Sequence, residues 1–157
     1  MKKQLQIDYE WLNHWKELPG SEHILVEKAL EAVADAYAPY SHFHVGAAVL
    51  LADGTIVKGN NQENIAYPSG LCAERVALFY AGANYPGTSV KTIVVMAKGE
   101  LIAEDECVSP CGSCRQVIAE SERRQEEPIR IILIAQDGKT WIFNSIKDIL
   151  IFPFGVK

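Results

Sequence analysis

The spacing of apolar residues changes several times along the chain, from helical spacing to strand spacing and back. After Ser21, a residue type that favours helix N-caps, apolar residues recur every three or four positions until Pro39 ends the pattern. The residues that share this helical face are Val26, Leu30, Val33 and Tyr37. Two apolar runs follow, over 45–51 and 55–58, and Ala52-Asp53-Gly54 between them predicts the turn of a β-hairpin.

The second half of the chain continues the alternation of helix and strand. We expect a helix from Cys72 to about Gly82, a strand over 90–97, a helix from Cys111 to about Arg124, strands over 129–135 and 140–143, and a short helix over 146–150. The run over 129–135 is apolar without interruption, which is typical of a strand buried on both faces. This order predicts an α/β fold, a three-layer α/β/α sandwich with helices on both faces of a mixed central sheet.

The first residues carry a different pattern. Apolar residues first alternate with polar ones, which predicts a short strand, and then recur at helical spacing. The alternating residues are Leu5, Ile7 and Tyr9, and those at helical spacing are Trp11, Trp15 and Leu18. We interpret residues 1–20 as an N-terminal extension packed on a single catalytic domain formed by residues 21–157.

Composition narrows the class of protein. The chain has 157 residues, of which 48% are hydrophobic and 22% charged, as in ordinary globular domains. A net charge of -5 and the absence of a Lys/Arg run argue against a polymeric nucleic acid as partner. The start lacks the apolar segment of a secretory signal, and no apolar run is long enough to span a membrane. We therefore expect a cytoplasmic protein without a membrane partner, and free thiols fit such a reducing compartment.

Three cysteines have the spacing of a metal site. Cys111 and Cys114 lie three residues apart, which places two sulfurs on one face of a helix's first turn, and Pro110 fits directly before such a start. Cys72 comes from a second predicted helix and completes a set of thiolates, which Zn²⁺ favours. Three protein ligands leave the fourth tetrahedral position open, and that is typical of a catalytic zinc site.

Polar residues beside the cysteines suggest how the site could work. Glu74 follows Cys72 by two residues, near enough to serve a metal-bound water as a proton shuttle. Because three thiolates on Zn²⁺ leave a negative charge, we expect Arg75, aided by Gln116, to hydrogen-bond a ligand sulfur.

Each of these interpretations has a structural alternative. The cysteines could be buried thiols, or a structural four-cysteine site completed by Cys107. Glu74 could be a solvated carboxylate in the first turn of a helix, and Arg75 could form a surface salt bridge.

Two further segments carry a family likeness. Residues 40–48 read Tyr-Ser-His-Phe-His-Val-Gly-Ala-Ala, and residues 59–67 read Gly-Asn-Asn-Gln-Glu-Asn-Ile-Ala-Tyr. With the cysteine motifs, they make residues 22–120 similar to the cytidine deaminase family, and specifically to its short homotetrameric members with a three-cysteine zinc site. The resemblance implies a homotetramer, with a dimer as the alternative, and one Zn²⁺ per subunit. The family's late aromatic C-terminal ending corresponds only loosely to residues 151–157.

The resemblance also implies roles for individual residues. Asn61 and Glu63 would hold the ribose hydroxyls, Phe43 would pack on the pyrimidine, and Tyr67 would contribute near a neighbouring subunit's site. As structural alternatives, Asn61 and Glu63 could be ordinary loop residues and Phe43 a core aromatic residue.

The activity that the resemblance implies is hydrolytic deamination of cytidine and 2′-deoxycytidine, in pyrimidine salvage. Glu74 would carry the protons, and Glu63 would disfavour phosphorylated nucleotides. Two alternatives remain open: a zinc deaminase of another cytosine-containing nucleoside or aminonucleoside antibiotic, and a non-enzymatic zinc-binding module.

Overall fold

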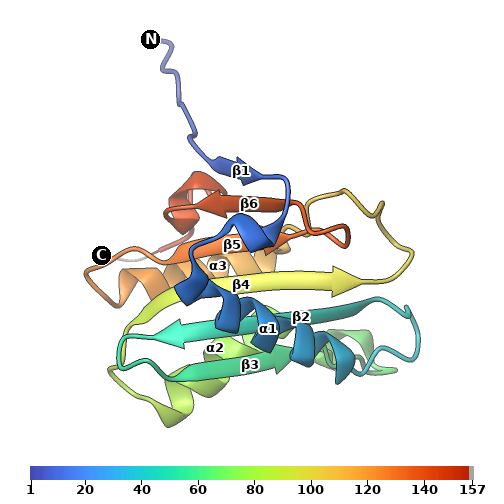
Figure 1. Ribbon diagram of the computed structural model, residues 1–157. Coiled ribbons are helices and arrows are strands. Elements are labelled where there is room, and N and C mark those ends of the chain that lie inside the picture. Colours follow the sequence, from blue (N-terminus) through green and yellow to red (C-terminus); the bar gives the residue numbers. More distant parts are fainter. Residues whose placement is uncertain (156–157) are drawn as a thin grey trace.

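The computed structural model describes residues 1–155 (Figure 1). In this part of the chain the helices are α1 (Gly20–Ala34), α2 (Ala73–Asn84) and α3 (Gly112–Arg123). The strands are β1 (Glu10–Leu12), β2 (His44–Leu51), β3 (Ile56–Asn60), β4 (Val90–Lys98), β5 (Arg130–Ile134) and β6 (Thr140–Phe143). Single 3-10 turns span Trp15–Glu17, Tyr67–Ser69 and Ile146–Asp148.

The six strands form one mixed sheet in the order β1-β6-β5-β4-β2-β3. β4 and β5 pair in parallel, and the other neighbouring strands pair antiparallel. Helix α1 covers one face of the sheet, while α2 and α3 cover the other (Figure 1). The predicted α/β/α sandwich with a mixed sheet is confirmed.

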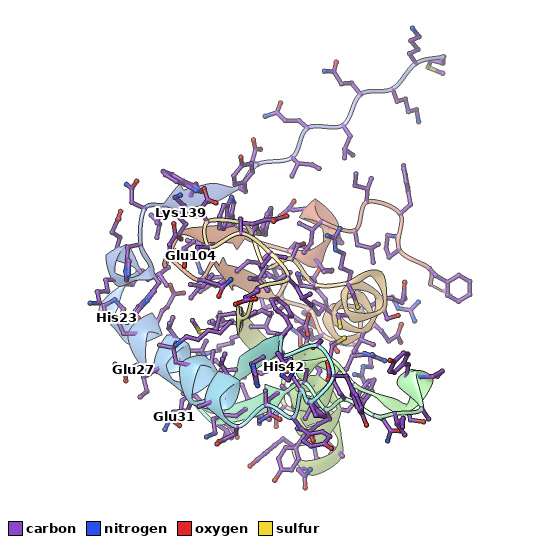
Figure 2. The ribbon with its side chains drawn as sticks, turned by 90° about the vertical axis from the view of Figure 1, so that its right-hand side faces the viewer. His23, Glu27, Glu31, His42, Glu104 and Lys139 are labelled. Carbon is purple, nitrogen blue, oxygen red and sulfur yellow. The ribbon has the colours of Figure 1, made fainter. Side chains whose placement is uncertain are left out.

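The core has two parts, one on each face of the sheet. Apolar side chains of β2, β4 and β5 point alternately toward α2 and α3 and toward α1. On β5, Ile131 and Leu133 face the first side and Ile132 and Ile134 the second, and all four are fully buried. The uninterrupted apolar run over 129–135 is therefore explained, as the sequence suggested, by burial of the strand on both of its faces. The outer side of α1 is polar and carries His23, Glu27 and Glu31 (Figure 2).

Two glycines allow the helices to approach the sheet closely. A Cβ atom at Gly46 would lie 2.3 Å from the carbonyl oxygen of Ala29 on α1, and one at Gly59 would lie 2.4 Å from the carbonyl oxygen of Ala73 on α2. Only glycine fits such contacts. Gly59 therefore fixes where α2 begins, next to the end of β3.

The N-terminal prediction was wrong in detail. Residues 1–9 lie in no helix or strand, and the strand is formed by Glu10–Leu12, where Trp11 pairs with Trp141 on β6. Only Trp15 lies in a helical turn, of the 3-10 type. Pairing with the edge of β6 determines which residues of the N-terminal segment form the strand. The local spacing of apolar residues could not reveal that edge.

The first helix also differs at both ends. It begins at Gly20 with Pro19 as N-cap, so Ser21 lies inside it, and it ends at Ala34. Tyr37, predicted on the helical face, instead exchanges backbone hydrogen bonds with the loop after β3: its N–H donates to the carbonyl of Asn61, and its carbonyl accepts from the N–H of Glu63. Tertiary pairing thus ends the helix before Pro39.

Among the described residues, none of the helices combines the length and apolar character needed to cross a membrane.

Candidate zinc centre

Two helix N-termini meet at the three cysteines. Cys72 is the N-cap of α2, Cys111 is the N-cap of α3, and Cys114 lies in the first turn of α3. The amides of a first helical turn have no intrahelical partner, and the helix dipole is positive there. Both helices therefore favour negatively charged thiolates at this point.

The sulfur spacing fits a tetrahedral zinc ion. The Sγ atoms of Cys72 and Cys111 are 3.9 Å apart, those of Cys111 and Cys114 are 3.5 Å apart, and all three lie within 4.8 Å of one another. Tetrahedral geometry with Zn–S bonds of about 2.3 Å requires S–S distances of about 3.8 Å. The cluster thus matches a three-thiolate zinc set with one open position.

Cys107 does not belong to this cluster. Its side chain is half-buried against the core, and burial raises the pKa of its thiol to about 11. A thiol with such a pKa is protonated at neutral pH and is a poor metal ligand. The alternative of a four-cysteine structural site therefore lacks its fourth member among the described residues.

A cation lies beside the sulfurs. Nη2 of Arg75 is 3.6 Å from Sγ of Cys72, the contact expected from the sequence. A hydrogen bond from the thiol of Cys114, together with one from Arg75, lowers the pKa of Cys72 to about 5. Because Cys114 donates its proton in this hydrogen bond, the pKa of Cys114 is raised.

The side-chain amide of Gln116 makes its hydrogen bonds elsewhere. Its Nε2 donates to the carbonyl of Phe154 at 2.7 Å, and its Oε1 accepts from the backbone N–H of Phe154 at 3.1 Å. The prediction that Gln116 assists Arg75 is not supported by these contacts.

Glu74 is buried next to the cluster. Its side chain, in the first turn of α2, is only 4% exposed. Burial raises the pKa of its carboxyl group, and the neighbouring thiolate of Cys72 acts in the same direction. The alternative of a solvated first-turn carboxylate does not fit this environment. A carboxyl group with a raised pKa holds a proton more readily than an ordinary glutamate does, as a proton shuttle requires.

These groups open into one cavity of about 660 Å³. Its wall includes Cys72, Cys111, Glu74 and Arg75 on the metal side and also contains Phe43, Asn61, Glu63 and Tyr67. The cavity thus brings together all four predicted substrate-binding residues, which come from two separate segments, with two of the three predicted metal ligands. Leu101 and Val108, on the loop that follows β4, add apolar wall that no sequence signal indicated.

Asn61 joins the loop after β3 to the start of β2. Its Oδ1 accepts a hydrogen bond from the N–H of Val45 at 2.7 Å, and its Nδ2 donates to the carbonyl of Phe43 at 2.8 Å. Phe43 packs against the core on one side and lines the cavity on the other. Its two interpretations, core residue and site residue, are therefore compatible.

Glu63 anchors the segment before β2. Its carboxylate accepts hydrogen bonds from the N–H groups of Tyr40 at 2.9 Å and Ser41 at 3.3 Å, and from the hydroxyl of Ser41. The Ser41 hydroxyl is the main cause that lowers the pKa of Glu63. Ser41 was missed as a site residue, although it lies in the segment that carried the resemblance.

Tyr67 lies at the rim of the cavity, where it begins a 3-10 turn and is 77% exposed. The centre of its ring is 6.3 Å from that of Tyr40.

Known proteins are similar to this chain in sequence and in fold. The family model described as the cytidine and deoxycytidylate deaminase zinc-binding region matches residues 20–126. The cytidine deaminase of Halalkalibacterium halodurans is 44% identical over 97 residues, which span 62% of this chain and 69% of that protein. The crystal structure of the cytidine deaminase from Burkholderia pseudomallei superposes with a TM-score of 0.73 at 38% identity, over 84% of this chain and 98% of that one.

A relative with a different name is also similar. The blasticidin-S deaminase of Bacillus cereus is 32% identical over 129 residues, which span 80% of this chain and 86% of that protein. Both named activities are deaminations, so the comparisons agree on the reaction class. With a matching family model over most of its length and a three-sulfur cluster at zinc spacing, the chain belongs to the cytidine and deoxycytidylate deaminase family of zinc-binding proteins.

Proposed function

We propose that this protein deaminates cytidine and 2′-deoxycytidine by hydrolysis, giving uridine and 2′-deoxyuridine with release of ammonia. The observation that carries the proposal is that Cys72 and Cys111 of the three-sulfur cluster line the same cavity as the buried Glu74 and the predicted substrate-binding residues Phe43, Asn61 and Glu63. A non-enzymatic zinc-binding module would need neither a buried carboxyl nor a cavity beside its metal.

Substrate recognition is proposed to rest on three side chains. Phe43 packs on the pyrimidine ring, which needs an apolar surface. Asn61 retains a second amide hydrogen, and the ionised carboxylate of Glu63 retains acceptor capacity, so both can pair with ribose hydroxyls. A ligand that lacked those hydroxyls would leave polar groups unpaired, at a cost of roughly 1 to 3 kcal/mol per group.

The chemical step is proposed to depend on Glu74. Cys72, Cys111 and Cys114 would hold a zinc ion, which when bound would lower the pKa of a water molecule toward neutrality, so that its oxygen can attack C4 of the base. The carboxylate of Glu74 takes the first proton of this water and delivers it to N3. It then takes the second proton, from the hydroxyl group formed at C4, and passes it to the amino group, so that the C4–N bond breaks, ammonia leaves and a carbonyl remains at C4. Because its pKa is raised, the same carboxyl can both accept and donate.

Charge favours nucleosides over nucleotides. The only cationic side chain in the described wall of the cavity is Arg75, which lies against a sulfur of Cys72. Glu63 adds a negative charge where the sugar would lie. A substrate phosphate would find no free cation there, and we therefore expect turnover of cytidine and 2′-deoxycytidine to exceed that of CMP.

A second candidate substrate is a cytosine-containing aminonucleoside antibiotic, which the similarity to blasticidin-S deaminase favours. The proton-transfer groups would serve either substrate, since both present the same aminopyrimidine. The experiment that separates them compares initial rates on cytidine, 2′-deoxycytidine and blasticidin S with the zinc-loaded protein. Faster conversion of blasticidin S would reverse the assignment.

We further propose a homotetramer, with a dimer as the alternative, acting in pyrimidine salvage in the cytoplasm. Exposed aromatic residues support an association surface: Tyr67, Phe79 and Tyr80 are all at least half exposed. The four free cysteines fit a reducing compartment. Light scattering tests the assembly, and the mass of four 17.4-kDa chains is expected.

A further inference from the structure

The side chain of Arg115 makes several hydrogen bonds that no role assigned so far explains. It follows Cys114 on α3, and its guanidinium group donates three hydrogen bonds: Nε to the carbonyl of Pro110 at 2.8 Å, Nη2 to the hydroxyl of Ser109 at 2.7 Å, and Nη1 to the carbonyl of Ile149 at 2.7 Å. One side chain thus joins α3, the loop before it and the end of the last 3-10 turn.

The segment that Arg115 holds leads directly into a zinc ligand. Pro110 precedes Cys111, whose side chain is exposed and whose backbone is extended as the N-cap of α3. Cys114, by contrast, is buried and fixed by the core. The backbone N–H of Arg115 also donates to the carbonyl of Cys111 at 2.9 Å, so Arg115 bonds the chain at this ligand and just before it.

We propose that Arg115 is a positioning residue for the zinc site. By holding the 109–110 segment against the C-terminal residues, it keeps the sulfur of Cys111 at ligand distance from those of Cys72 and Cys114. The inference rests on the zinc chemistry of the proposed function and deepens it. Arg115 is not part of the cavity wall, so it acts on the metal through Cys111 and not on the substrate.

The geometry explains why arginine is required. Its planar fork directs three donors at fixed angles to three acceptors, whereas a lysine ammonium group on a flexible stem cannot reproduce them. The neighbouring Gln116 binds both backbone groups of Phe154, so two successive residues of α3 hold the C-terminal segment. The last described residues therefore form part of the support of the metal site.

The test compares Arg115→Lys and Arg115→Met with wild type and with Arg124→Met, a control on an exposed arginine at the far end of α3. The full-length proteins are loaded with zinc, and transfer of zinc to a chromophoric chelator is timed. Loss of groups that orient metal ligands typically costs about 10- to 100-fold in metal affinity, so zinc transfer should accelerate by about tenfold or more in both Arg115 variants. Arg124→Met should behave as wild type.

Thermal unfolding of the metal-free proteins separates positioning from plain stability. If Arg115→Lys melts at a lower temperature but releases zinc at the wild-type rate, or if Arg124→Met accelerates release equally, the proposal is overturned. Should Arg115→Met fail to fold, Arg115→Lys decides the matter. The chelator assay contains no nucleoside, so a wild-type protein that holds zinc but fails to deaminate cytidine would overturn the proposed function alone.

Discussion

Glu74 combines two properties that a proton shuttle needs, burial and nearness to the metal ligands. We predict that Glu74→Gln lowers deamination by at least about 100-fold, because the amide cannot accept a proton. The variant should still bind zinc, since the glutamate is not a ligand in this arrangement. Metal content by atomic absorption and the rate on cytidine test this together. Loss of zinc from Glu74→Gln would assign the residue a structural role instead.

Arg75 lies 3.6 Å from Sγ of Cys72, where we propose that its cation balances the charge of the three thiolates. We predict that Arg75→Ala weakens zinc binding or turnover by about tenfold or more, as for other groups that hydrogen-bond metal ligands. Chelator competition and steady-state kinetics measure the two effects, with Arg124→Ala as the exposed control. A variant unchanged in both measurements would show that Arg75 is only a surface cation.

Cys107 should react more slowly than Cys72. Its pKa is raised to about 11 by burial, so the reactive thiolate is scarce at neutral pH and becomes abundant only as the pH approaches that value. In zinc-free protein at neutral pH, we predict that iodoacetamide modifies Cys72 before Cys107. Peptide mass spectrometry reports the order, and the reverse order would contradict the assigned environments.

At the scale of elements, the position of α2 decides whether the site forms. Gly59→Ala would place a Cβ atom 2.4 Å from the backbone of Ala73, where no side-chain movement can relieve the clash. We predict a loss of about 1 to 3 kcal/mol of unfolding free energy, as for other overpacking substitutions, together with reduced activity, because α2 carries Glu74.

Gly82 on the same helix provides the matched control. A Cβ atom there meets nothing within 4 Å, and alanine favours a helix over glycine by up to about 1 kcal/mol. Gly82→Ala should therefore leave stability unchanged or raise it. Chemical denaturation of both variants measures the difference, and equal destabilisation would contradict the role given to close packing at Gly59.

Elements with a strong local pattern could be predicted from the sequence, and those that depend on distant partners could not. The strand Thr140–Phe143 was predicted with its bounds, and the two cysteine helices were predicted to begin at the residues that cap them. The strand Glu10–Leu12 was misplaced because only the free edge of β6 selects it. Ser41 was missed for the same reason, and so was the contact of Arg115 with Ile149, since both contacts join residues that are far apart in sequence.

At the scale of the whole molecule, the fold gathers the site from four parts of the chain. The 40–45 segment and the 61–67 loop supply the residues that we propose face the substrate, and the N-termini of α2 and α3 supply the sulfurs and Glu74. The two sides are held by different contacts, Asn61 and Glu63 on one and Arg115 on the other.

The most direct test of the account is the ultraviolet absorbance change when the zinc-loaded protein is mixed with cytidine, with 2′-deoxycytidine, CMP and cytosine measured alongside. Conversion of the two nucleosides, with CMP and the free base much slower, is the predicted result, because we propose that Asn61 and Glu63 bind the sugar hydroxyls and because Arg75 is the one cationic residue in the described cavity wall. No conversion of either nucleoside by protein with stoichiometric zinc would contradict it.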